Sequence, residues 1–363
     1  MAKKPYGIAV IGAGWVSSQH ISAYRNNPNA EILAICDINT DNARRRASQA
    51  GLDGVAIYDN AADAIGHDGV DAVSICTPQH IHFENVLVAA EQGKHMVIEK
   101  PLANSLDQMR QMRDAVNKAG VKTVVGFVLR WNPLFQNIKK LIARGDLGEI
   151  YYTETDYQSY NSSWWAGWEQ GRRKDLSNSA MAVAGCHAVD ALRWFAAGGE
   201  NQAAEPIEVF GYAAGKRKGK QYQYNPVTND WSKQAVMEYD GLEVLLVRFS
   251  NGVLGKVSVN FERIGSYTFP INIFGDKGTI KKNKVFAPKS PDDKQWCEIP
   301  GDCPDSSDVT HHPFQGEIDH FIECIDKDVE SHCNINDAIK THEIFFGAQK
   351  CYEIGKPVKL PLI

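Results

Sequence analysis

The stretch that decides the fold is Gly7-Ile8-Ala9-Val10-Ile11-Gly12-Ala13-Gly14, an apolar run that ends in a glycine-rich turn. The segment that follows, Trp15 to Asn26, can continue as a helix. Strand, glycine turn and helix in this order are the context in which a dinucleotide-binding fingerprint is meaningful. Gly12 permits the tight turn, and Gly14 lets the backbone approach a pyrophosphate at the helix amino terminus. The third glycine position holds Ser17, so the fingerprint is incomplete, although a small residue still allows close helix-to-strand packing.

An acidic residue follows the second apolar run, Glu31 to Cys36. Asp37 lies 23 residues after Gly14, near the distance expected for an acid that binds the adenosine ribose. Its carboxylate would accept hydrogen bonds from the ribose hydroxyls and repel a 2′-phosphate, which favours NAD over NADP. The arginines at 44–46 keep NADP as the less favoured alternative, because one of them could reach a phosphate. The expected cofactor contacts in this part of the chain are Gly12, Ala13, Gly14, Trp15, Val16 and Asp37.

Further apolar runs predict strands at 71–76, 95–98 and 123–127, with helices between them. A Ser105-Leu106-Asp107-Gln108 capping box predicts the start of one of these helices. Alternating strands and helices over residues 1–127 predict a parallel, doubly wound α/β sheet, the Rossmann type of dinucleotide-binding domain.

Two of these strands end in polar loops that are suited to a ligand. Thr77-Pro78 and the nearby His82 follow one strand, and Glu99-Lys100-Pro101 follows the next. Open α/β sheets bind ligands at the carboxyl ends of their strands, so Lys100 is the first candidate for chemistry. An isolated lysine at a strand end is more often simply solvated. The histidines at 80 and 82 could suggest a metal, but no acidic or cysteine ligand stands nearby, so loop polarity or packing against a cofactor is favoured over coordination.

Residues 128–363 have a different pattern. Polar and apolar residues alternate from 148 to 160, and glycines at Asp240-Gly241, Asn251-Gly252 and Lys277-Gly278 indicate tight turns between strands. Helices are expected at 179–196, 314–326 and 336–354. The prediction is an α+β domain with a large, mostly antiparallel sheet.

The composition limits the class of protein. A chain of 363 residues is long enough for two domains, and its formal charge of −5 argues against nucleic acid as a partner. The eight cysteines have no zinc-binding spacing, and no metal site is expected. No apolar signal region or membrane-spanning run is present, so we expect no membrane partner and a cytoplasmic location.

Taken together, the motifs resemble the Gfo/Idh/MocA oxidoreductase family over essentially the whole chain. The matching positions are Gly12-Ala13-Gly14, Cys76-Thr77-Pro78, Glu99-Lys100-Pro101, Gly126-Phe127 with Arg130, Gly185-Cys186-His187 with Asp190, and His312-Pro313-Phe314. The resemblance implies a two-domain NAD(P)-dependent dehydrogenase of sugars or polyols. It implies Lys100 and His187 as catalytic residues, and it adds Thr77, Pro78, His82, Glu99, Lys100 and Arg130 to the expected cofactor contacts.

One departure affects the expected proton relay. Many members of the family carry an aspartate four residues before the catalytic histidine, and here that position is Val183. On a helix, Val183, His187 and Asp190 would share one face, so Asp190 could orient the imidazole or bind a substrate hydroxyl. His187 suits the role of base for the alcohol proton, and Lys100 suits that of donor to the developing alkoxide.

A tryptophan-rich stretch, 157–168, is followed by basic residues at 172–174 and suits carbohydrate binding. Tyr157, Trp165 and Arg173 are the preferred substrate residues there, although the aromatic side chains could equally be packing anchors. The expected function is oxidation of a secondary hydroxyl of a sugar, glycoside or cyclic polyol. The alternatives are glycoside cleavage through transient oxidation and elimination, and a non-catalytic NAD-binding sensor. A homodimer or homotetramer is expected.

Overall fold

The computed structural model describes residues 4–159, 169–216, 218–219, 221–222, 235–263, 265–290, 292, 295–303 and 309–363. The chain divides into two compact units. The first comprises Met1–Trp131 and Asp308–Ala338, and the second comprises Asn132–Ser307 and Ile339–Ile363. The sequence predicted a division into residues 1–127 and 128–363. It did not predict that residues 308–338 belong to the first unit.

The first unit is built on a six-stranded parallel sheet with the strand order β3-β2-β1-β4-β5-β6. The strands are β1 (Tyr6–Ile11), β2 (Ala30–Cys36), β3 (Ala56–Tyr58), β4 (Val70–Ile75), β5 (His95–Ile98) and β6 (Thr123–Val125). The helices are α1 (Ser17–Asn26), α2 (Thr40–Gln49), α3 (Ala61–Ile65), α4 (Gln79–Glu91), α5 (Leu106–Ala119), the 3₁₀ turns η1 (Val128–Trp131) and η3 (Val309–His311), and α11 (Phe314–Lys327). This confirms the predicted doubly wound sheet and adds the short strand β3.

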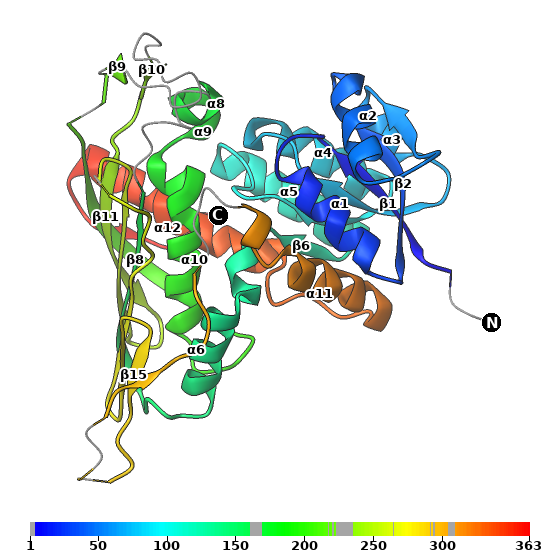
Figure 1. Ribbon diagram of the computed structural model, residues 1–363. Helices are drawn as coiled ribbons and strands as arrows, with labels where there is room; N and C mark the ends of the chain where they lie inside the picture. Colours follow the sequence, from blue (N-terminus) through cyan, green and yellow to red (C-terminus); the bar gives the residue numbers. More distant parts are fainter. Residues whose placement is uncertain are drawn as a thin grey trace. The chain divides into compact units, whose positions relative to one another are not determined.

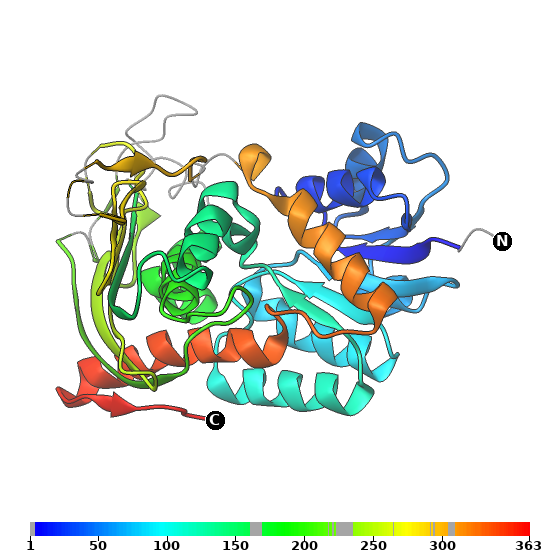
Figure 2. The ribbon, with the colours of Figure 1, turned by 90° about the horizontal axis from the view of Figure 1, so that it is seen from below.

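Helices cover both faces of this sheet (Figure 2), with α11 beside α1 on one face and α4 beside α5 on the other. The amphipathic helix α11 turns Phe314, Ile318 and Phe321 inward, which explains why a segment so late in the sequence belongs to the first unit. The predicted cap of α5 is also present, since Ser105 Oγ accepts a hydrogen bond from the Gln108 N–H at 3.2 Å.

The second unit is built on a nine-stranded sheet with the order β16-β15-β14-β13-β7-β12-β11-β8-β17. Its strands are β7 (Ile150–Gln158), β8 (Pro206–Ala214), β11 (Leu242–Phe249), β12 (Leu254–Asn260), β13 (Ile271–Gly275), β14 (Thr279–Lys281), β15 (Lys284–Phe286), β16 (Cys297–Glu298) and β17 (Val358–Lys359), and a separate pair is formed by β9 (Gln221–Tyr222) and β10 (Ala235–Val236). Only β12 and β7 pair in parallel within the described strands of this sheet, so the prediction of a mostly antiparallel sheet is confirmed.

The second unit also contains several helices. They are α6 (Pro133–Ala143), α8 (Glu169–Arg172), α9 (Lys174–Ser177), the π-helix η2 (Met181–Gly185), α10 (Cys186–Phe195) and α12 (Ile335–Ile354), which begins in the first unit. Figure 1 shows α10 and α6 beside the sheet, and α10 contacts β7 and β12 directly. Residues of β11 alternate between buried and exposed, as expected for a strand that is covered on one face only.

The sequence did not reveal α6, although its start carries clear signals. Asn132 caps this helix by accepting from the N–H groups of Leu134 and Phe135, and Pro133 occupies its first turn. The predicted turn at Asn251-Gly252 joins β11 to β12, and Gly252 has a φ of +86° as that turn requires. Within the described residues, no helix is both long enough and apolar enough to cross a bilayer.

Candidate active site

Backbone hydrogen bonds bring the carboxyl ends of the central strands together in the first unit. The N–H of Gly12 donates to Cys36, that of Cys76 to Ile11, and that of Glu99 to Ile75, at 2.7 to 3.0 Å. The glycine turn, the Thr77-Pro78 loop and the Glu99-Lys100 segment therefore follow the adjacent strands β1, β4 and β5 at one edge of the sheet. This is the edge at which the sequence predicts a ligand.

The two glycines of the turn are required for different reasons. Gly12 has a φ of +92°, and a Cβ there would come within 2.8 Å of the Cys76 backbone. The backbone conformation and the packing of the chain therefore require glycine at this position. A Cβ at Gly14 would meet nothing within 4 Å, so packing within the chain does not explain that glycine. The open space fits a bound group that approaches the backbone. Ser17 is fully buried and its hydroxyl donates to the Gly14 carbonyl at 2.8 Å, which agrees with the close packing expected at the third position.

Asp37 is tied directly to the glycine turn. Its carboxylate accepts hydrogen bonds from the backbone N–H groups of Ala13 and Asn39, both at 2.9 Å. Arg46 also reaches the turn, because its Nε donates to the Gly14 carbonyl at 3.0 Å and lies 3.3 Å from that of Ala13. Arg45 instead pairs with Asn42 on α2. Two polar side chains from neighbouring elements therefore shape this end of the site.

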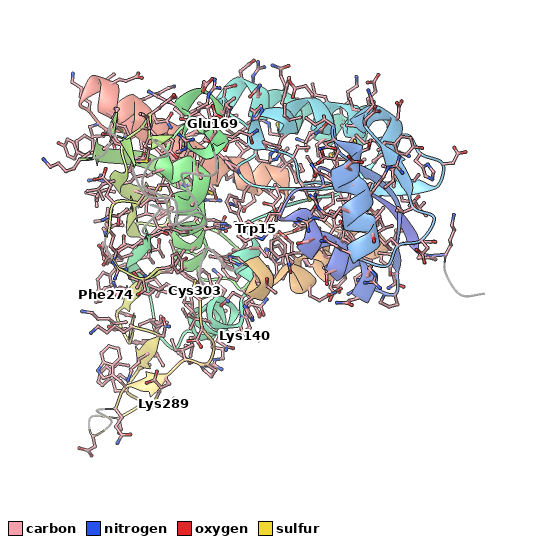
Figure 3. The ribbon with its side chains drawn as sticks, turned by 45° about the horizontal axis from the view of Figure 1, so that its top comes forward. Trp15, Lys140, Glu169, Phe274, Lys289 and Cys303 are labelled. Atoms are coloured by element: carbon pink, nitrogen blue, oxygen red, sulfur yellow. The ribbon has the colours of Figure 1, made fainter. Side chains whose placement is uncertain are left out.

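Apolar side chains beside the turn are exposed. Trp15, labelled in Figure 3, is 58% exposed, and Ile38, which follows Asp37, is 95% exposed. Val16, the residue before α1, is partly exposed. Exposed apolar groups at the edge of a nucleotide-binding type of sheet can pack against a flat ring.

His82 is buried between the two strand-end loops. Its Nδ1 lies 2.9 Å from the Pro101 carbonyl oxygen, and its Nε2 lies 2.7 Å from the Thr77 carbonyl oxygen. Burial lowers the pKa of His82, although both carbonyl oxygens act in the opposite direction. Thr77 is held further by Asn85, which donates to its hydroxyl at 3.2 Å. His82 thus links the Thr77-Pro78 loop to the segment that carries Lys100.

Lys100 is partly exposed at the end of β5, and its peptide bond to Pro101 is cis. Glu99 is buried and points into the unit, where its carboxylate faces the imidazole of His20 at 3.0 Å. The structure therefore places the two predicted cofactor residues differently, with Lys100 at the accessible edge and Glu99 in the interior.

His187 lies in the second unit, in the first turn of α10, and is 9% exposed. The π-helical turn η2 directly precedes it and contains Val183, so the regular spacing expected over 183–190 holds only from His187 to Asp190. π-Turns are rare and occur frequently at functional sites. Asp190 is buried and accepts a hydrogen bond from the Thr341 hydroxyl at 3.1 Å, and Arg193 donates to the same hydroxyl at 2.7 Å.

The predicted substrate residues have different environments. Tyr157 is buried in the second unit, with its ring 5.2 Å from Tyr267 and 6.1 Å from Phe261, an arrangement typical of a packing anchor. Arg173 is partly exposed and pairs with Asp175. Trp165 lies outside the described residues.

Arg130, which the family resemblance placed near the cofactor, is buried at the end of the first unit. Its Nη1 donates to the His332 carbonyl and its Nη2 to the Asp337 carboxylate, both at 2.6 Å. These partners fit a role in holding residues 332–337 against η1.

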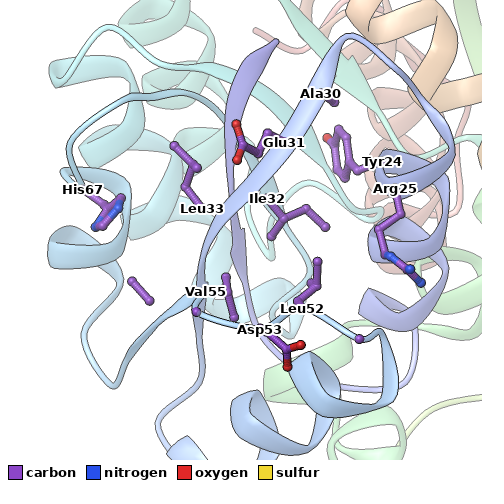
Figure 4. A pocket seen from close by; sticks show the side chains of 13 residues that line it. Tyr24, Arg25, Ala30, Glu31, Ile32, Leu33, Leu52, Asp53, Val55 and His67 are labelled. Atoms are coloured by element: carbon purple, nitrogen blue, oxygen red, sulfur yellow. The ribbon is translucent and has the colours of Figure 1, made fainter.

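A separate pocket of about 420 Å³ lies in the first unit where β2 and β3 begin, at the opposite edge of the sheet (Figure 4). Tyr24, Arg25, Glu31, Leu33, Asp53 and His67 line it. It contains none of the predicted site residues. In the described part of the chain, no group of three histidine, cysteine or acidic side chains is arranged to hold a metal.

Sequence reasoning missed several residues at the site. They are His20, Ser74 and Glu317, which surround Glu99 or its partner. Their identities alone gave no signal, because buried polar residues of a helix or strand are recognised only when their partners are known. Ile38 was also missed, although an apolar residue directly after Asp37 was a signal that the sequence did offer.

The strand order, the glycine turn and the acid at the end of β2 define the first unit as a dinucleotide-binding Rossmann domain. Residues 6–127 match the NAD-binding Rossmann fold of the GFO/IDH/MocA oxidoreductase family. Residues 135–281 match the C-terminal domain of the same family. The chain belongs to the GFO/IDH/MocA family of NAD-binding oxidoreductases, as the sequence motifs indicated.

Among curated proteins, the chain is 25% identical to the uncharacterized oxidoreductase YrbE of Bacillus subtilis, over 97% of this chain and 95% of that protein. It is 30% identical to the D-glucoside 3-dehydrogenase of Escherichia coli, over 53% of this chain and 55% of the relative. It is 26% identical to an inositol 2-dehydrogenase of Rubrobacter xylanophilus, over 76% and 70% of the two chains. The fold also matches that of levoglucosan dehydrogenase in complex with NADH and levoglucosan, with a TM-score of 0.81, 21% identity, and coverage of 99% and 100%.

Proposed function

We propose that this protein is an NAD-dependent dehydrogenase that oxidises a secondary hydroxyl of a sugar, glycoside or cyclic polyol. The observation that carries the proposal is the position of Lys100. It follows β5 at the same sheet edge as the glycine turn after β1 and the Thr77-Pro78 loop after β4. A cationic donor beside a dinucleotide-binding edge suits the stabilisation of a developing alkoxide.

The residues of this edge fit the cofactor that the family binds. The open space at Gly14 and the start of α1 suit the pyrophosphate, and Asp37 suits the adenosine ribose. The exposed side chain of Ile38 offers an apolar surface for the adenine ring. When bound, the nicotinamide ring supplies the hydride acceptor.

The preference for NAD over NADP rests on charge. Asp37 is held with its carboxylate at the turn, where it would repel a 2′-phosphate. Arg46, the basic residue that reaches the turn, already donates to the carbonyl of Gly14. These contacts support NAD as the working cofactor.

The chemistry of the substrate is divided between two side chains. Oxidation of a carbinol releases the hydroxyl proton as the hydride departs, so a base must take that proton. We assign this role to His187, with Asp190 as the residue that orients it or binds a substrate hydroxyl. Lys100 donates to the substrate oxygen. The second unit, which carries His187, is then the substrate-binding domain, with Arg173 and Trp165 among its substrate contacts.

The substrate class comes from the relatives. A D-glucoside 3-dehydrogenase, an inositol 2-dehydrogenase and levoglucosan dehydrogenase all have names that refer to carbohydrates or cyclic polyols. Their identities to this chain are 21 to 30%, which supports the class of substrate rather than one compound.

The test is absorbance monitoring of NADH formation with a panel of monosaccharides, glycosides and inositols. We expect turnover of at least one member, with NAD preferred to NADP. Lys100→Ala should lower kcat/KM by about 100-fold to 10,000-fold, because a positioned donor is lost. Absence of turnover with every compound would refute the dehydrogenase assignment. Undiminished turnover in the variant would refute the role of Lys100.

We also propose that the second unit mediates self-association through the face of its sheet opposite α10. Aligned side chains on this face include Tyr212 opposite Val244 and Leu254 opposite Tyr152. Tyr212 is 69% exposed and Leu246 is 46% exposed, an unusual concentration of apolar groups on an open sheet face. A homodimer that covers this face is the expected form of the protein.

A further inference from the structure

A group of polar side chains is buried in the first unit beside the Lys100 segment. It comprises His20 and Tyr24 of α1, Ser74 of β4, Glu99 after β5, and Glu317 of α11. None of them is more than 7% exposed. Ionisable groups are rarely buried unless they are paired, so the partners within this cluster matter.

His20 connects two of these groups. Its Nδ1 lies 2.7 Å from the Ser74 hydroxyl, and its Nε2 lies 3.0 Å from Oε1 of Glu99. The other carboxylate oxygen of Glu99 accepts the backbone N–H of Lys100 at 3.2 Å. Ser74, His20 and Glu99 thus form a hydrogen-bonded chain that ends on the backbone of Lys100.

The pKa values of His20 and Glu99 shift in opposite directions. Burial would lower the pKa of His20, but Cys76 and Glu99 together raise it well above its usual value. Burial would raise the pKa of Glu99, but the bond and charge of His20 and the charge of Lys100 lower it. Both shifts favour an ion pair of an imidazolium with a carboxylate, in which each ring nitrogen carries a proton to donate.

Glu317 is the second carboxyl group of the cluster, and it differs from Glu99. Within the described structure neither of its carboxyl oxygens has a hydrogen-bond partner, and burial raises its pKa to about 8, with His20 and Glu99 as the charged groups that act on it. Phe314, on the preceding turn of α11, packs on the His20 ring at 5.0 Å. Glu99 is thus the carboxyl group of the cluster that is ionised at neutral pH.

The surroundings of Glu99 leave room for this arrangement. A Cβ at Gly126 would come within 3.1 Å of Oε2 of Glu99, so glycine at that position lets the carboxylate lie beside β6. A buried ion pair adds little net stability, because desolvation offsets most of the attraction. Its location next to Lys100 therefore favours a role in the site over a role in folding.

We propose that Glu99 and His20 are positioning residues for Lys100: His20 fixes the Glu99 carboxylate, which in turn holds the Lys100 backbone and lies near its ammonium group. This inference rests on the catalytic role proposed for Lys100. In this proposal Glu99 positions Lys100 from the interior of the first unit, whereas the sequence analysis expected Glu99 to contact the cofactor. Loss of the carboxylate should misplace the lysine and reduce kcat by about 10- to 100-fold, whereas NAD binding should stay nearly unchanged.

The test compares Glu99→Gln with Glu91→Gln, the same chemical change at an exposed position of α4. The first measurement needs no substrate: limited acetylation with acetic anhydride at pH 8, in which mass spectrometry follows Lys100 relative to the exposed Lys118. In Glu99→Gln we expect the relative labelling rate of Lys100 to change about two-fold or more, because the Glu99 carboxylate that accepts the Lys100 N–H no longer holds this segment in place. The Glu91→Gln protein should match the wild type.

The second measurement separates positioning from cofactor binding. Protein fluorescence gives the Kd for NAD, and steady-state kinetics gives kcat with the substrate found in the panel. We expect kcat to fall in Glu99→Gln while the Kd for NAD changes by less than about three-fold. A Kd that rises in proportion to the loss of kcat would overturn the proposal and make Glu99 a cofactor ligand. Unchanged labelling of Lys100 in the folded variant would overturn it as well.

A second pair of variants applies if Glu99→Gln does not fold. His20→Gln keeps an N–H donor for the Glu99 carboxylate and His20→Leu does not, so His20→Gln should retain more of the wild-type kcat and Lys100 labelling. Equal values in the two variants would refute the role of His20. If no compound in the panel is oxidised but the labelling responds as expected, the positioning role stands and the proposed dehydrogenase function fails.

Discussion

Nε2 of His20 lies 3.0 Å from Oε1 of Glu99 in the interior of the first unit, and this contact ties α1 to the end of β5. The two residues are separated by 79 positions in the sequence. The helix that begins at the dinucleotide-binding turn is therefore linked to the segment that carries Lys100. The candidate site and the buried polar side chains around Glu99 are therefore connected by hydrogen bonds.

The stability of the protein should depend on pH through Glu317. Its pKa is about 8 in the folded state, above the ordinary value of 4.5, so the folded state binds more protons than the unfolded state between these limits. Stability due to this group is fully present below about pH 4.5 and is lost as the pH rises through 8, by at most about 1.4 kcal/mol per pH unit. In Glu317→Gln this slope should be absent. Urea unfolding at pH 5.5, 6.5, 7.5 and 8.5 measures the difference, and parallel curves for both proteins would contradict the prediction.

Cofactor preference should respond to Asp37. Asp37→Asn keeps the shape of the side chain and can still accept the backbone N–H of Ala13, but it removes the charge. We expect the ratio of kcat/KM for NAD over NADP to fall by about 10-fold, mostly because NADP binds better. Asp41→Asn, an exposed change on α2, is the matched control and should leave the ratio as in the wild type. A preference for NADP in the wild-type protein would show that the basic residues outweigh Asp37.

The proposed base can be tested at His187. His187→Gln should lower kcat by about 100-fold to 10,000-fold, because proton transfer from the substrate hydroxyl is lost. The Kd for NAD, measured without substrate, should remain close to the wild-type value. Asp190→Asn should change the pH profile of kcat if the carboxylate orients His187. An identical profile and activity in Asp190→Asn would instead assign Asp190 to the buried network with Thr341 and Arg193.

Arg130 is expected to stabilise the first unit. Its side chain is 1% exposed and is paired with Asp337, so Asp337→Asn leaves a buried guanidinium without its counter-charge. The free energy of unfolding should fall by about 3 to 5 kcal/mol, as measured by denaturant titration. Arg110→Met, which removes an exposed ion pair with Asp107, should have little measurable effect. If a folded Arg130→Met protein binds NAD far more weakly, Arg130 is a cofactor residue as the family resemblance implied.

Self-association should depend on the open face of the second sheet. Leu246→Glu introduces a charge among the exposed apolar side chains of β8, β11 and β12, and a covered face would not accept it. Light scattering coupled to gel filtration should show the wild type as a dimer or larger assembly and Leu246→Glu as a monomer. The control is Ile354→Glu, at an exposed position at the end of α12. A wild-type monomer would refute the proposed interface.

The sequence by itself determined the architecture, and it predicted where part of the site lies. The run from Gly7 to Gly14, the capping box at Ser105 and the turn at Asn251-Gly252 all took the structures that their residues predicted. Such features depend on sterics and hydrogen bonds within a few residues, so they can be read without the fold. The same locality explains why Asp37 and Lys100 could be assigned to one edge of a parallel sheet, since the carboxyl ends of its strands always meet there.

Only the tertiary structure decided which polar groups are partners. His20 and Glu99 are 79 residues apart, and Thr341 and Asp190 are 151 apart. The return of α11 to the first unit, and with it Glu317, follows from the packing of its apolar face on α1. Burial and the distance to a partner fix the charge of an ionisable side chain, and neither is encoded in its neighbours along the chain. For this reason the sequence could predict Lys100 as the catalytic lysine, whereas the structure alone revealed the buried groups beside its backbone.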